Sequence, residues 1–453
     1  MYDMIVIGAG SGGLNIAMFL NRVGLKVLLV DKSDKNIGGD CLNYGCVPSK
    51  ALIHAARLLN DKGLAQKFGL RCNGTVDLKK VMVHVKERQS VIRKHENANY
   101  FQKIGIDVAL GKARFEGKNS ISVNKKRYSG KKIVIATGSR PRDLGFDGLT
   151  NETIFDLEKL PKKLAVIGGG PIGLELGQAF NRFGSKVTVI QRGSKLLPKE
   201  CKEITGVLLN RLQSEGIQFI FNSEAESIGK KIKLDDGSRV SYDQVLISAG
   251  RILNIEGLDL EKAGIRTKEG KILVDRYLRT TNRDIYLCGD IVGSYQFTHA
   301  AELHASVILN NLFSPFRKKI SYDNLSWVTY TSPEIATFGL NEERLKLRNI
   351  KYHKLVHDLK EDDRAIIEDK RYGKLILYID KKRILGGTMI ADDAGEMIQE
   401  LILANSTGMP YKRIFEKIYP YPTRSRVNKR IFTEYLAKKL TGRNKKILRM
   451  LYH

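Results

Sequence analysis

The feature that most constrains the fold of this chain is a duplicated segment. The stretch "YDMIVIGAGSGGLNIAMFLNRVGLKVLLVDKS" begins at residue 2, and "KKLAVIGGGPIGLELGQAFNRFGSKVTVIQRG" begins at residue 162. Each copy reads as an apolar strand, a G-x-G-x-x-G turn, a helix, a second glycine turn and another apolar strand. This order is a βαβ unit. The repeat therefore predicts an α/β protein that contains two Rossmann-like domains.

Three glycines in each copy have separate mechanical roles. The first permits the tight turn, the second lets a pyrophosphate approach the backbone, and the third allows the helix to pack closely on the strand. Because each copy follows a strand and opens a helix, a dinucleotide site is favoured over a merely tight turn. The positions concerned are Gly8, Gly10 and Gly13, with Ser11 and Gly12 between them, and Gly168, Gly170 and Gly173 in the second copy.

The two copies differ where the second strand ends, which is the part of such a unit that contacts the adenosine ribose. The first copy ends in Asp31 followed by Lys32, and the Asp31 carboxylate can accept hydrogen bonds from both ribose hydroxyls. The second ends in Gln191 and Arg192, with Lys195 nearby, and offers cations to a 2′-phosphate. We predict a flavin-type site in the first copy and an NADPH site in the second. NADH remains the alternative, because Arg192 could be an ordinary surface residue.

Further segments extend this plan. "KKIVIATGSRP" and "YDQVLISAGR" each read as a buried strand leaving through a turn of small residues, and "RDIYLCGDIVG" delivers a carboxylate to a glycine-flanked strand end. Residues 78–103 have the apolar spacing of one long helix. From about residue 320 the pattern changes to that of a separate α+β domain. We predict one domain from 1–140 and 272–318, a second from 141–271, a third from 319–440 and a basic tail from 441–453.

Two cysteines five positions apart lie in "GGDCLNYGCVPSK", residues 38–50. They could form a structural bridge, half of a metal site or a redox couple. Five cysteines in 453 residues do not indicate a disulfide-stabilised secreted scaffold. Cys72, Cys201 and Cys288 are isolated in the sequence, so Cys41 and Cys46 lack a second pair for tetrahedral zinc. The sequence therefore favours a redox couple and predicts no metal site.

The surroundings of the pair suit redox chemistry. Residues five apart in a regular helix are roughly 8–9 Å apart, too far for a disulfide, so the backbone between them must be irregular. Gly39 and Gly45 supply that freedom. Cys46 then opens a helix, with Lys50 one turn further on, and both features lower the pKa of a thiol.

The net charge of +28 concentrates partly after Arg424, where the only acidic residue is Glu434. This tail could make a weak contact with an anionic surface, although a solvated lysine-rich face is the simpler interpretation. No nucleic-acid-binding motif accompanies the charge, so we expect no specific nucleic-acid partner. No apolar run approaches membrane-spanning length, and Met1 leads directly into "MIVIGAG". We therefore expect a cytoplasmic protein.

The cysteine motif, the two fingerprints, "ATGSRP", "SAGR" and "YLCGD" resemble the class I pyridine nucleotide-disulfide oxidoreductases, which include lipoamide dehydrogenase, glutathione reductase and mercuric reductase. The resemblance extends from residue 2 to about 440. It implies a homodimer with FAD in the first domain, NAD(P)H in the second and a C-terminal dimerisation domain. It also implies that a hydride passes from nicotinamide to flavin and then to the disulfide.

By this resemblance Cys46 is the flavin-proximal sulfur and Cys41 the interchange thiol, while Lys50 lies near the flavin and pairs with Glu175 from "GLELG". Asp31 and Asp290 are expected to hold FAD. The other positions expected to contact a cofactor are Gly39, Asp40, Ala113, Thr137, Gly138, Gly250, Arg251 and His299 of "FTHAA".

The chain departs from the family in "YPYPTRSRV". Tyr421 stands where lipoamide dehydrogenase and glutathione reductase have the acid–base histidine, and Arg426 where they have its glutamate. A phenol with a pKa of about 10 is a poor base at pH 7. A tyrosine here resembles mercuric reductase, as does "VTVIQR", although no cysteine follows Cys288 to form a C-terminal metal-delivering pair.

Three hypotheses follow. The first is an FAD-dependent NADPH oxidoreductase that resembles mercuric reductase and reduces a metal ion, a quinone or a disulfide. The second is an NAD-dependent dihydrolipoamide dehydrogenase with an atypical acid–base site. The third is a flavin-binding scaffold docked through its basic tail. An assay with dihydrolipoamide separates the first two, and Cys41→Ser separates both from the third.

Overall fold

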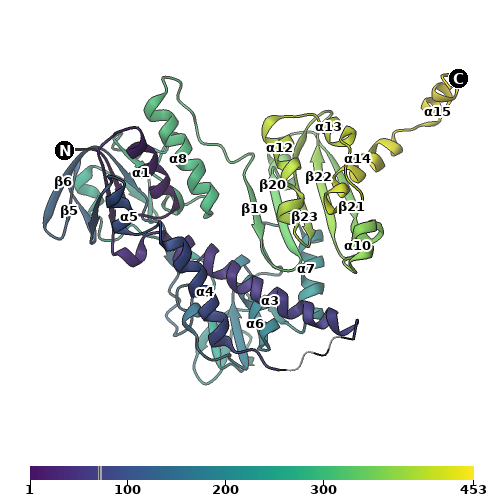
Figure 1. Ribbon diagram of the computed structural model, residues 1–453, viewed down its shortest axis with the longest axis horizontal. Coiled ribbons are helices and arrows are strands. Elements are labelled where there is room, and N and C mark those ends of the chain that lie inside the picture. Colours follow the sequence, from purple (N-terminus) through teal and green to yellow (C-terminus); the bar gives the residue numbers. More distant parts are fainter. Residues whose placement is uncertain (70, 72–73, 453) are drawn as a thin grey trace. The chain divides into compact units, whose positions relative to one another are not determined.

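The computed structural model describes residues 1–69, 71 and 74–452, so Cys72 and the last residue of the basic tail lie outside it. The chain forms two compact units, one from residues 1–194 and 218–320 and the other from 195–217 and 321–453 (Figure 1). Residues 195–217 thus belong to the second unit, although the predicted NAD(P)H domain spans 141–271. The boundaries between the FAD and NAD(P)H domains remain a prediction.

The N-terminal sheet of the first unit has a parallel part in the order β3-β2-β1-β6-β18. β1 and β2 are almost completely buried apolar runs, as expected for parallel strands covered on both faces. β6 continues beyond this part, and its first residues pair antiparallel with β5, which pairs with β4. The strands are β1 (Tyr2–Ile7), β2 (Val27–Asp31), β3 (Asp107–Leu110), β4 (Ala113–Gly117), β5 (Ser120–Val123), β6 (Lys126–Ile135) and β18 (Ile285–Leu287).

Helices of the first unit place the cysteine motif beside this sheet. α1 (Ser11–Arg22) joins β1 to β2 and packs against α8 (Thr298–Phe313) (Figure 1). α2 (Gly39–Asn43) and α3 (Cys46–Gln66) follow β2, and α3 packs against α4 (Leu78–Arg93). The prediction of one helix over 78–103 is wrong. α4 ends at Arg93, and α5 (Ala98–Lys103) starts anew because Asn97 caps it by accepting a hydrogen bond from the Tyr100 N–H.

The second copy of the repeat forms a parallel sheet in the order β10-β9-β8-β14. α6 (Pro171–Phe183) joins β8 to β9, with proline at its start and Gly184 in the left-handed region after its end. α6 packs against α3, so the two copies meet at the cysteine helix. The strands are β8 (Lys163–Ile167), β9 (Lys186–Gln191), β10 (Gln218–Phe221) and β14 (Gln244–Ile247).

Smaller strands complete the first unit. β7 pairs antiparallel with β15, so the chain around residue 140 lies beside the "SAGR" segment. The remaining strands are β7 (Ser139–Pro141), β11 (Ala225–Ile228), β12 (Ile232–Leu234), β13 (Arg239–Val240), β15 (Arg251–Leu253), β16 (Thr267–Lys268) and β17 (Lys271–Ile272).

The second unit is an antiparallel sheet in the order β19-β20-β23-β22-β21, with helices packed around it (Figure 1). Its core includes Phe338, Leu377, Met389, Leu401 and Phe432, all fully buried. The strands are β19 (Ser326–Thr329), β20 (Glu334–Gly339), β21 (His353–Asp358), β22 (Lys374–Ile379) and β23 (Ile384–Ala391). The helices are α7 (Lys202–Ser214), α9 (Glu342–Leu347), α10 (Asp363–Ile367), α11 (Ala394–Met397), α12 (Gln399–Thr407), α13 (Tyr411–Glu416), α14 (Val427–Lys438) and α15 (Gly442–Met450).

The predicted fold class is confirmed: two Rossmann-like βαβ segments precede a C-terminal α+β domain. In the described part of the chain, none of the helices has the length and apolar character needed to cross a bilayer.

Candidate active site

The first glycine turn forms a cradle of bare backbone between β1 and α1. Gly8 has a φ of +110°, and a Cβ there would lie 2.2 Å from the carbonyl oxygen of Ala136. A Cβ on Gly13 would lie 2.0 Å from the carbonyl oxygen of Gly8, so only glycine lets α1 start this close to the strand. At Gly10 the nearest atom to such a Cβ is 3.6 Å away. The turn therefore leaves its backbone open at the position where a pyrophosphate would bind.

The second turn repeats this geometry. Gly168 has a φ of +111°, and a Cβ on Gly173 would lie 2.3 Å from the carbonyl oxygen of Gly168. Around Gly170 the added Cβ would meet open space apart from the neighbouring residues of the turn, so the backbone there is accessible. Both turns thus fit a dinucleotide.

Asp31 and Gln191 hold their turns in the same way but differ in charge. The Asp31 Oδ2 atom accepts a hydrogen bond from the Ala9 N–H at 2.7 Å, and Oδ1 accepts from the Lys32 N–H at 2.6 Å. The Gln191 Oε1 atom accepts from the Gly169 N–H at 2.8 Å. Burial raises the pKa of Asp31, and these two backbone hydrogen bonds oppose that rise. The second site therefore keeps the anchor but loses the carboxylate.

The two cations expected beside Gln191 belong to different units. The Arg192 side chain is 80% exposed, with its guanidinium 3.9 Å from the Glu224 carboxylate. Lys195 belongs to the second unit, and its ammonium donates to the carbonyl oxygen of Glu200 at 3.0 Å. Arg192 alone is thus left exposed at the end of β9.

Asp290 belongs to a polar cluster that sequence reasoning found only in part. The Ser139 hydroxyl donates to the Asp290 Oδ2 atom at 2.6 Å and accepts from the Arg251 Nε–H at 2.7 Å. Arg251 also lies 3.3 Å from the Asp40 carboxylate. Burial raises the pKa of Asp290. Ser139 was missed, although "ATGSRP" contains it. Arg251 of "SAGR" therefore lies beside Asp40 and Asp290, two residues expected to contact FAD.

The remaining expected cofactor residues occupy the same unit. The Thr137 hydroxyl donates to the Asn254 carbonyl oxygen at 2.7 Å, and Gly138, with a φ of +70°, accepts from the Asn254 N–H at 3.0 Å. His299 lies in the first turn of α8, and its ring stacks on Phe297 with centroids 5.3 Å apart. The others outside the cysteine motif are Ser11, the first residue of α1, Ala113, which is buried on β4, Gly250, which has a φ of +104°, and Gly12, where a Cβ would lie 2.6 Å from the Cys288 sulfur.

The two cysteines of the motif lie on either side of a helix break. Cys41 is in α2, and Cys46 is the first residue of α3, so the backbone between them is irregular, as predicted. Gly39 has a φ of +61°, whereas a Cβ on Gly45 would lie 2.9 Å from the Asp40 carbonyl oxygen. Gly45 is therefore needed for a close approach rather than for a positive φ. Both cysteines are free thiols, and Cys46 is exposed.

The thiols are electrostatically unequal. A hydrogen bond with Cys41 lowers the pKa of Cys46 to about 6, and Thr298 and the charge of Lys50 add to this effect. The same interaction with Cys46, together with burial, raises the pKa of Cys41. The Thr298 Oγ1 atom lies 3.6 Å from the Cys46 sulfur. Thr298 is a site residue that the sequence reasoning missed, although it precedes His299 in "FTHAA".

Lys50 and Glu175 form the expected ion pair. α3 packs against α6, and this packing brings the Lys50 Nζ atom within 2.8 Å of the Glu175 Oε2 atom. The Glu175 side chain is 7% exposed and that of Lys50 is 35% exposed. The pair therefore places a partly shielded ammonium one turn after Cys46.

Tyr421 and Arg426 lie together in the second unit. Tyr421 is 64% exposed and follows α13, and the Arg426 guanidinium carbon lies 5.0 Å from the centre of its ring. This is a cation–π contact. Tyr421 and Arg426 are thus in contact.

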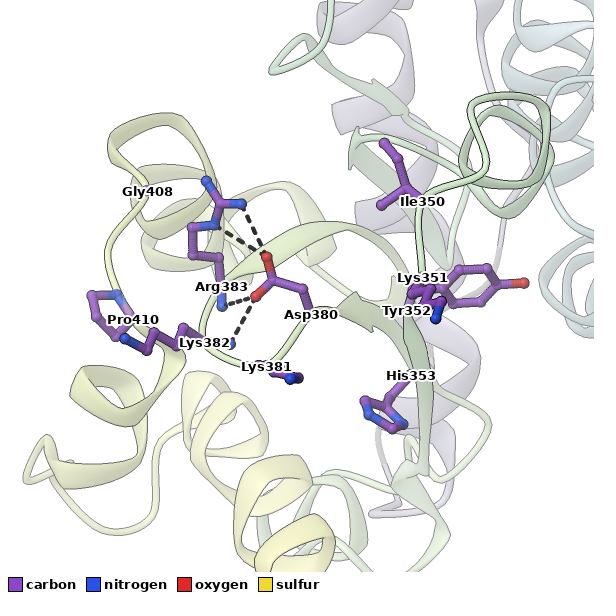
Figure 2. Close-up of a pocket in the computed structure, with 10 residues that line it drawn as sticks. All are labelled: Ile350, Lys351, Tyr352, His353, Asp380, Lys381, Lys382, Arg383, Gly408 and Pro410. Carbon is purple, nitrogen blue, oxygen red and sulfur yellow. Dashed lines mark hydrogen bonds and ion pairs between the residues drawn. The ribbon is translucent and has the colours of Figure 1, made fainter.

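A separate pocket of the second unit contains none of the expected site residues. Its lining is rich in basic side chains, and Arg383 is paired with Asp380 (Figure 2). The lining residues are Ile350, Lys351, Tyr352, His353, Asp380, Lys381, Lys382, Arg383, Gly408 and Pro410. Across the described ranges, His, Cys, Asp and Glu side chains do not come together in threes that could hold a metal ion.

Two dinucleotide cradles, one of which lies beside a thiol pair at a helix start, define an oxidoreductase of two cofactors and a dithiol. The family descriptions "Pyridine nucleotide-disulphide oxidoreductase" and "Pyridine nucleotide-disulphide oxidoreductase, dimerisation domain" match residues 2–305 and 325–430. The chain belongs to the pyridine nucleotide-disulphide oxidoreductase family. It is a flavin-dependent enzyme of that family, which uses FAD and takes electrons from NAD(P)H.

Similar proteins cover nearly the whole chain. A mercuric reductase from Lysinibacillus sphaericus is 31% identical over 93% of this chain and 80% of the relative. A dihydrolipoyl dehydrogenase from Thermus scotoductus is 34% identical over 94% of this chain and 95% of the relative. The solved structure of the HOCl-induced flavoprotein disulfide reductase RclA from Escherichia coli has a TM-score of 0.85 and 26% identity, with 95% and 99% of the two chains covered. A Cu(II) complex of the same reductase is equally similar.

Proposed function

We propose that this enzyme passes electrons from NADPH to a Cys41–Cys46 disulfide and from the resulting dithiol to a metal ion. The observation that carries the proposal is the asymmetry of the two thiols. Cys46 opens α3 and has a pKa of about 6, while the pKa of Cys41 is raised. The difference favours the thiolate on Cys46 and the proton on Cys41.

This difference between the thiols fits the products of the reductive half-reaction, which are one thiol and one thiolate. NADPH supplies a hydride and becomes NADP⁺, and the disulfide takes up the two electrons and the proton. The S–S bond breaks, Cys41 receives the proton, and Cys46 is left as the thiolate. Thr298 and Lys50 stabilise that thiolate, so the reduced state forms without a further proton from solvent.

Bound FAD would supply two-electron transfer between the nicotinamide and the disulfide. Gly10 would leave room for its pyrophosphate, and Asp31 would hold its ribose. Asp290, positioned by Ser139 and Arg251, would accept a hydrogen bond from its sugar chain. Lys50 lies one turn after Cys46 on α3 and is held there by Glu175. In this position Lys50 would contact the flavin ring.

The end of β9 favours NADPH over NADH. Gln191 fixes the turn through Gly169 without a negative charge, and the exposed Arg192 would exchange its 3.9 Å contact with Glu224 for a 2′-phosphate. The change Gln191→Asp tests this, because a carboxylate would repel the phosphate. We expect the kcat/KM ratio of NADPH to NADH to fall at least about tenfold, which corresponds to about 1.4 kcal/mol. An unchanged ratio would reject NADPH selectivity at this position.

The residue expected to face the electron acceptor, Tyr421, supports a metal ion as that acceptor. We propose a homodimer, formed by the dimerisation domain, in which Tyr421 of the partner subunit completes the site. The tyrosine has no imidazole to shuttle a proton, but a soft metal ion needs thiolates rather than a base. The two cysteines would lose two electrons and the Cys41 proton as the disulfide re-forms. Those electrons would reduce one Hg(II) to Hg(0) or two Cu(II) to Cu(I). A Cu(II) complex is known for the similar reductase.

The second candidate is a dihydrolipoyl dehydrogenase, and the 34% identity to such an enzyme favours it. Purified enzyme with FAD should be assayed with NADPH and with NADH and, in turn, Hg(II), Cu(II), a benzoquinone and oxidised lipoamide. Each assay is repeated with Cys41→Ser. Our proposal predicts thiol-dependent turnover with a metal ion and slow turnover with lipoamide. Fast lipoamide turnover would replace it with the second candidate, and fast quinone turnover that survives Cys41→Ser would exclude the dithiol from the path.

A further inference from the structure

The last helix, α15, follows α14 after a short exposed segment. Thr441 caps the helix by accepting from the Asn444 N–H at 3.4 Å, and the Asn444 side chain donates to the Lys439 carbonyl oxygen at 2.9 Å. Every residue from 437 to 452 is exposed. α14 differs, because it buries Val427 and Phe432 in the core of the unit. α15 is therefore a helix whose residues are all exposed.

The last two turns of the chain carry an apolar face. At about 100° per residue, Ile447 and Leu448 of α15 and Leu451 directly after it fall within an arc of about 100°. Asn444 falls in the same arc one turn earlier, and Arg443 falls near its edge. Their exposed fractions are 47%, 55% and 64%. Lys445, Lys446 and Arg449 fall on the opposite arc, and the apolar residues Met450 and Tyr452 flank the two faces. Because two exposed aliphatic residues on α15 and a third directly after it lie on one face, this segment is not a uniformly polar, lysine-rich surface.

The charge of this segment is uniform. After Glu434 the sequence contains no acidic residue, and the chain as a whole carries a net charge of +28. A second copy of the chain would bring like charge to the helix, which disfavours self-association through it. A nucleic acid would attract the lysines but would leave the apolar face in water. An anionic bilayer accommodates both faces, because acyl chains cover the aliphatic side chains and headgroups pair with the cations.

We propose that α15, with Leu451 and Tyr452, docks the enzyme on the surface of an anionic lipid bilayer. The helix lies in the plane of the interface with Ile447, Leu448 and Leu451 toward the acyl chains. Its nine residues are too few to span a bilayer, so the contact is peripheral and reversible. The proposal does not depend on the electron acceptor, since the site residues lie in other segments.

Vesicle sedimentation tests the docking with the full-length enzyme and bound FAD. We expect it to sediment with vesicles of phosphatidylcholine and phosphatidylglycerol, but not with phosphatidylcholine alone. The triple change Ile447→Ser, Leu448→Ser and Leu451→Ser should weaken this binding at least about tenfold while all charges stay in place. NADPH-dependent turnover of that variant should equal that of the wild type, which shows that the fold is intact.

The basic pocket supplies a matched control for charge. Lys351, Lys381 and Lys382 are exposed and line the pocket shown in Figure 2. Changing these three lysines to Gln removes the same charge as Lys445→Gln, Lys446→Gln and Arg449→Gln, but leaves α15 untouched. The variant with Gln at positions 445, 446 and 449 should lose vesicle binding. The variant with Gln at the three pocket positions should keep most of it. Equal losses would mean that net charge alone drives the contact and would overturn the proposal.

Tryptophan fluorescence measures the insertion of this segment into the bilayer directly. In Tyr452→Trp, the emission of the new indole should shift to shorter wavelength when phosphatidylglycerol vesicles are added, whereas the wild type, with Trp327 alone, should not respond. Failure of the wild type to bind any vesicle would refute docking. Retained vesicle binding in the serine variant would refute insertion. Wild-type binding to duplex RNA without vesicle binding, or a change of oligomeric state in the serine variant, would assign α15 to nucleic acid or to a subunit contact instead.

Discussion

Lys50 and Glu175 should move the pKa of Cys46 in opposite directions. The positive charge of Lys50 lowers that pKa, and the negative charge of Glu175 raises it. The change Lys50→Met removes the first effect and leaves the second. Glu175→Gln removes the second and leaves the lysine in place. A purely structural role for the ion pair would instead change both variants in the same direction.

The size of the shift follows from the exposure of the pair. A full charge close to a titrating group shifts its pKa by about 1 to 3. Lys50 is 35% exposed and lies 2.8 Å from Glu175, so screening places its effect at the lower end. We therefore expect Lys50→Met to raise the pKa of Cys46 from about 6 to about 7. At pH 6 the thiolate fraction would fall by about fivefold.

Alkylation of the reduced enzyme by iodoacetamide measures this, because only the thiolate reacts. Rates for the Cys46 peptide, quantified by mass spectrometry, are followed across the pH range in the wild type, Lys50→Met and Glu175→Gln. Lys80→Met, at an exposed position on α4, is the control and should match the wild type. The reasoning fails if Lys50→Met leaves the pH profile unchanged or if both variants shift it the same way.

Three further predictions concern other parts of the site. Asp31→Asn should weaken FAD binding at least about tenfold, because an amide oxygen cannot replace both carboxylate acceptors; flavin release on dilution, followed by fluorescence, would show it, and unchanged release would contradict it. Gly173→Ala places a methyl group 2.3 Å from a backbone carbonyl oxygen of its turn and should lower the melting temperature and raise the KM for NADPH; wild-type values for both would show that the turn relaxes freely. Tyr421→His combined with Arg426→Glu should raise dihydrolipoamide turnover at least about tenfold, whereas no gain would place the missing acid–base group elsewhere.

Sequence reasoning succeeded where a local pattern determines the backbone. The duplicated glycine turns require positive φ and close packing at fixed positions, so both βαβ units could be predicted from spacing alone. The helix start at Cys46 followed from Gly39 and Gly45, which precede it. The Lys50–Glu175 pair came from the resemblance, because it depends on α3 packing against α6 across 125 residues.

Tertiary contacts explain what could not be predicted. Ser139 bridges Asp290 and Arg251, which lie 151 and 112 residues away in the sequence. Thr298 reaches Cys46 from α8, 252 residues away. Apolar spacing over 78–103 could not reveal that Asn97 would cap a second helix, because such a side chain competes with the helix for backbone hydrogen bonds. Lys195 belongs to the second unit. Its position four residues after Gln191 in the sequence could not reveal this.

The central claim is that NADPH reduces a disulfide between Cys41 and Cys46. The oxidised enzyme with bound FAD is mixed with NADPH without oxygen, quenched with an alkylating agent and analysed by peptide mass spectrometry. We predict that one equivalent of NADPH makes Cys41 and Cys46 alkylatable together, while alkylation of Cys201 and Cys288 does not change. If both cysteines are equally alkylated without NADPH, or stay blocked after NADPH is consumed, the dithiol is not on the electron path.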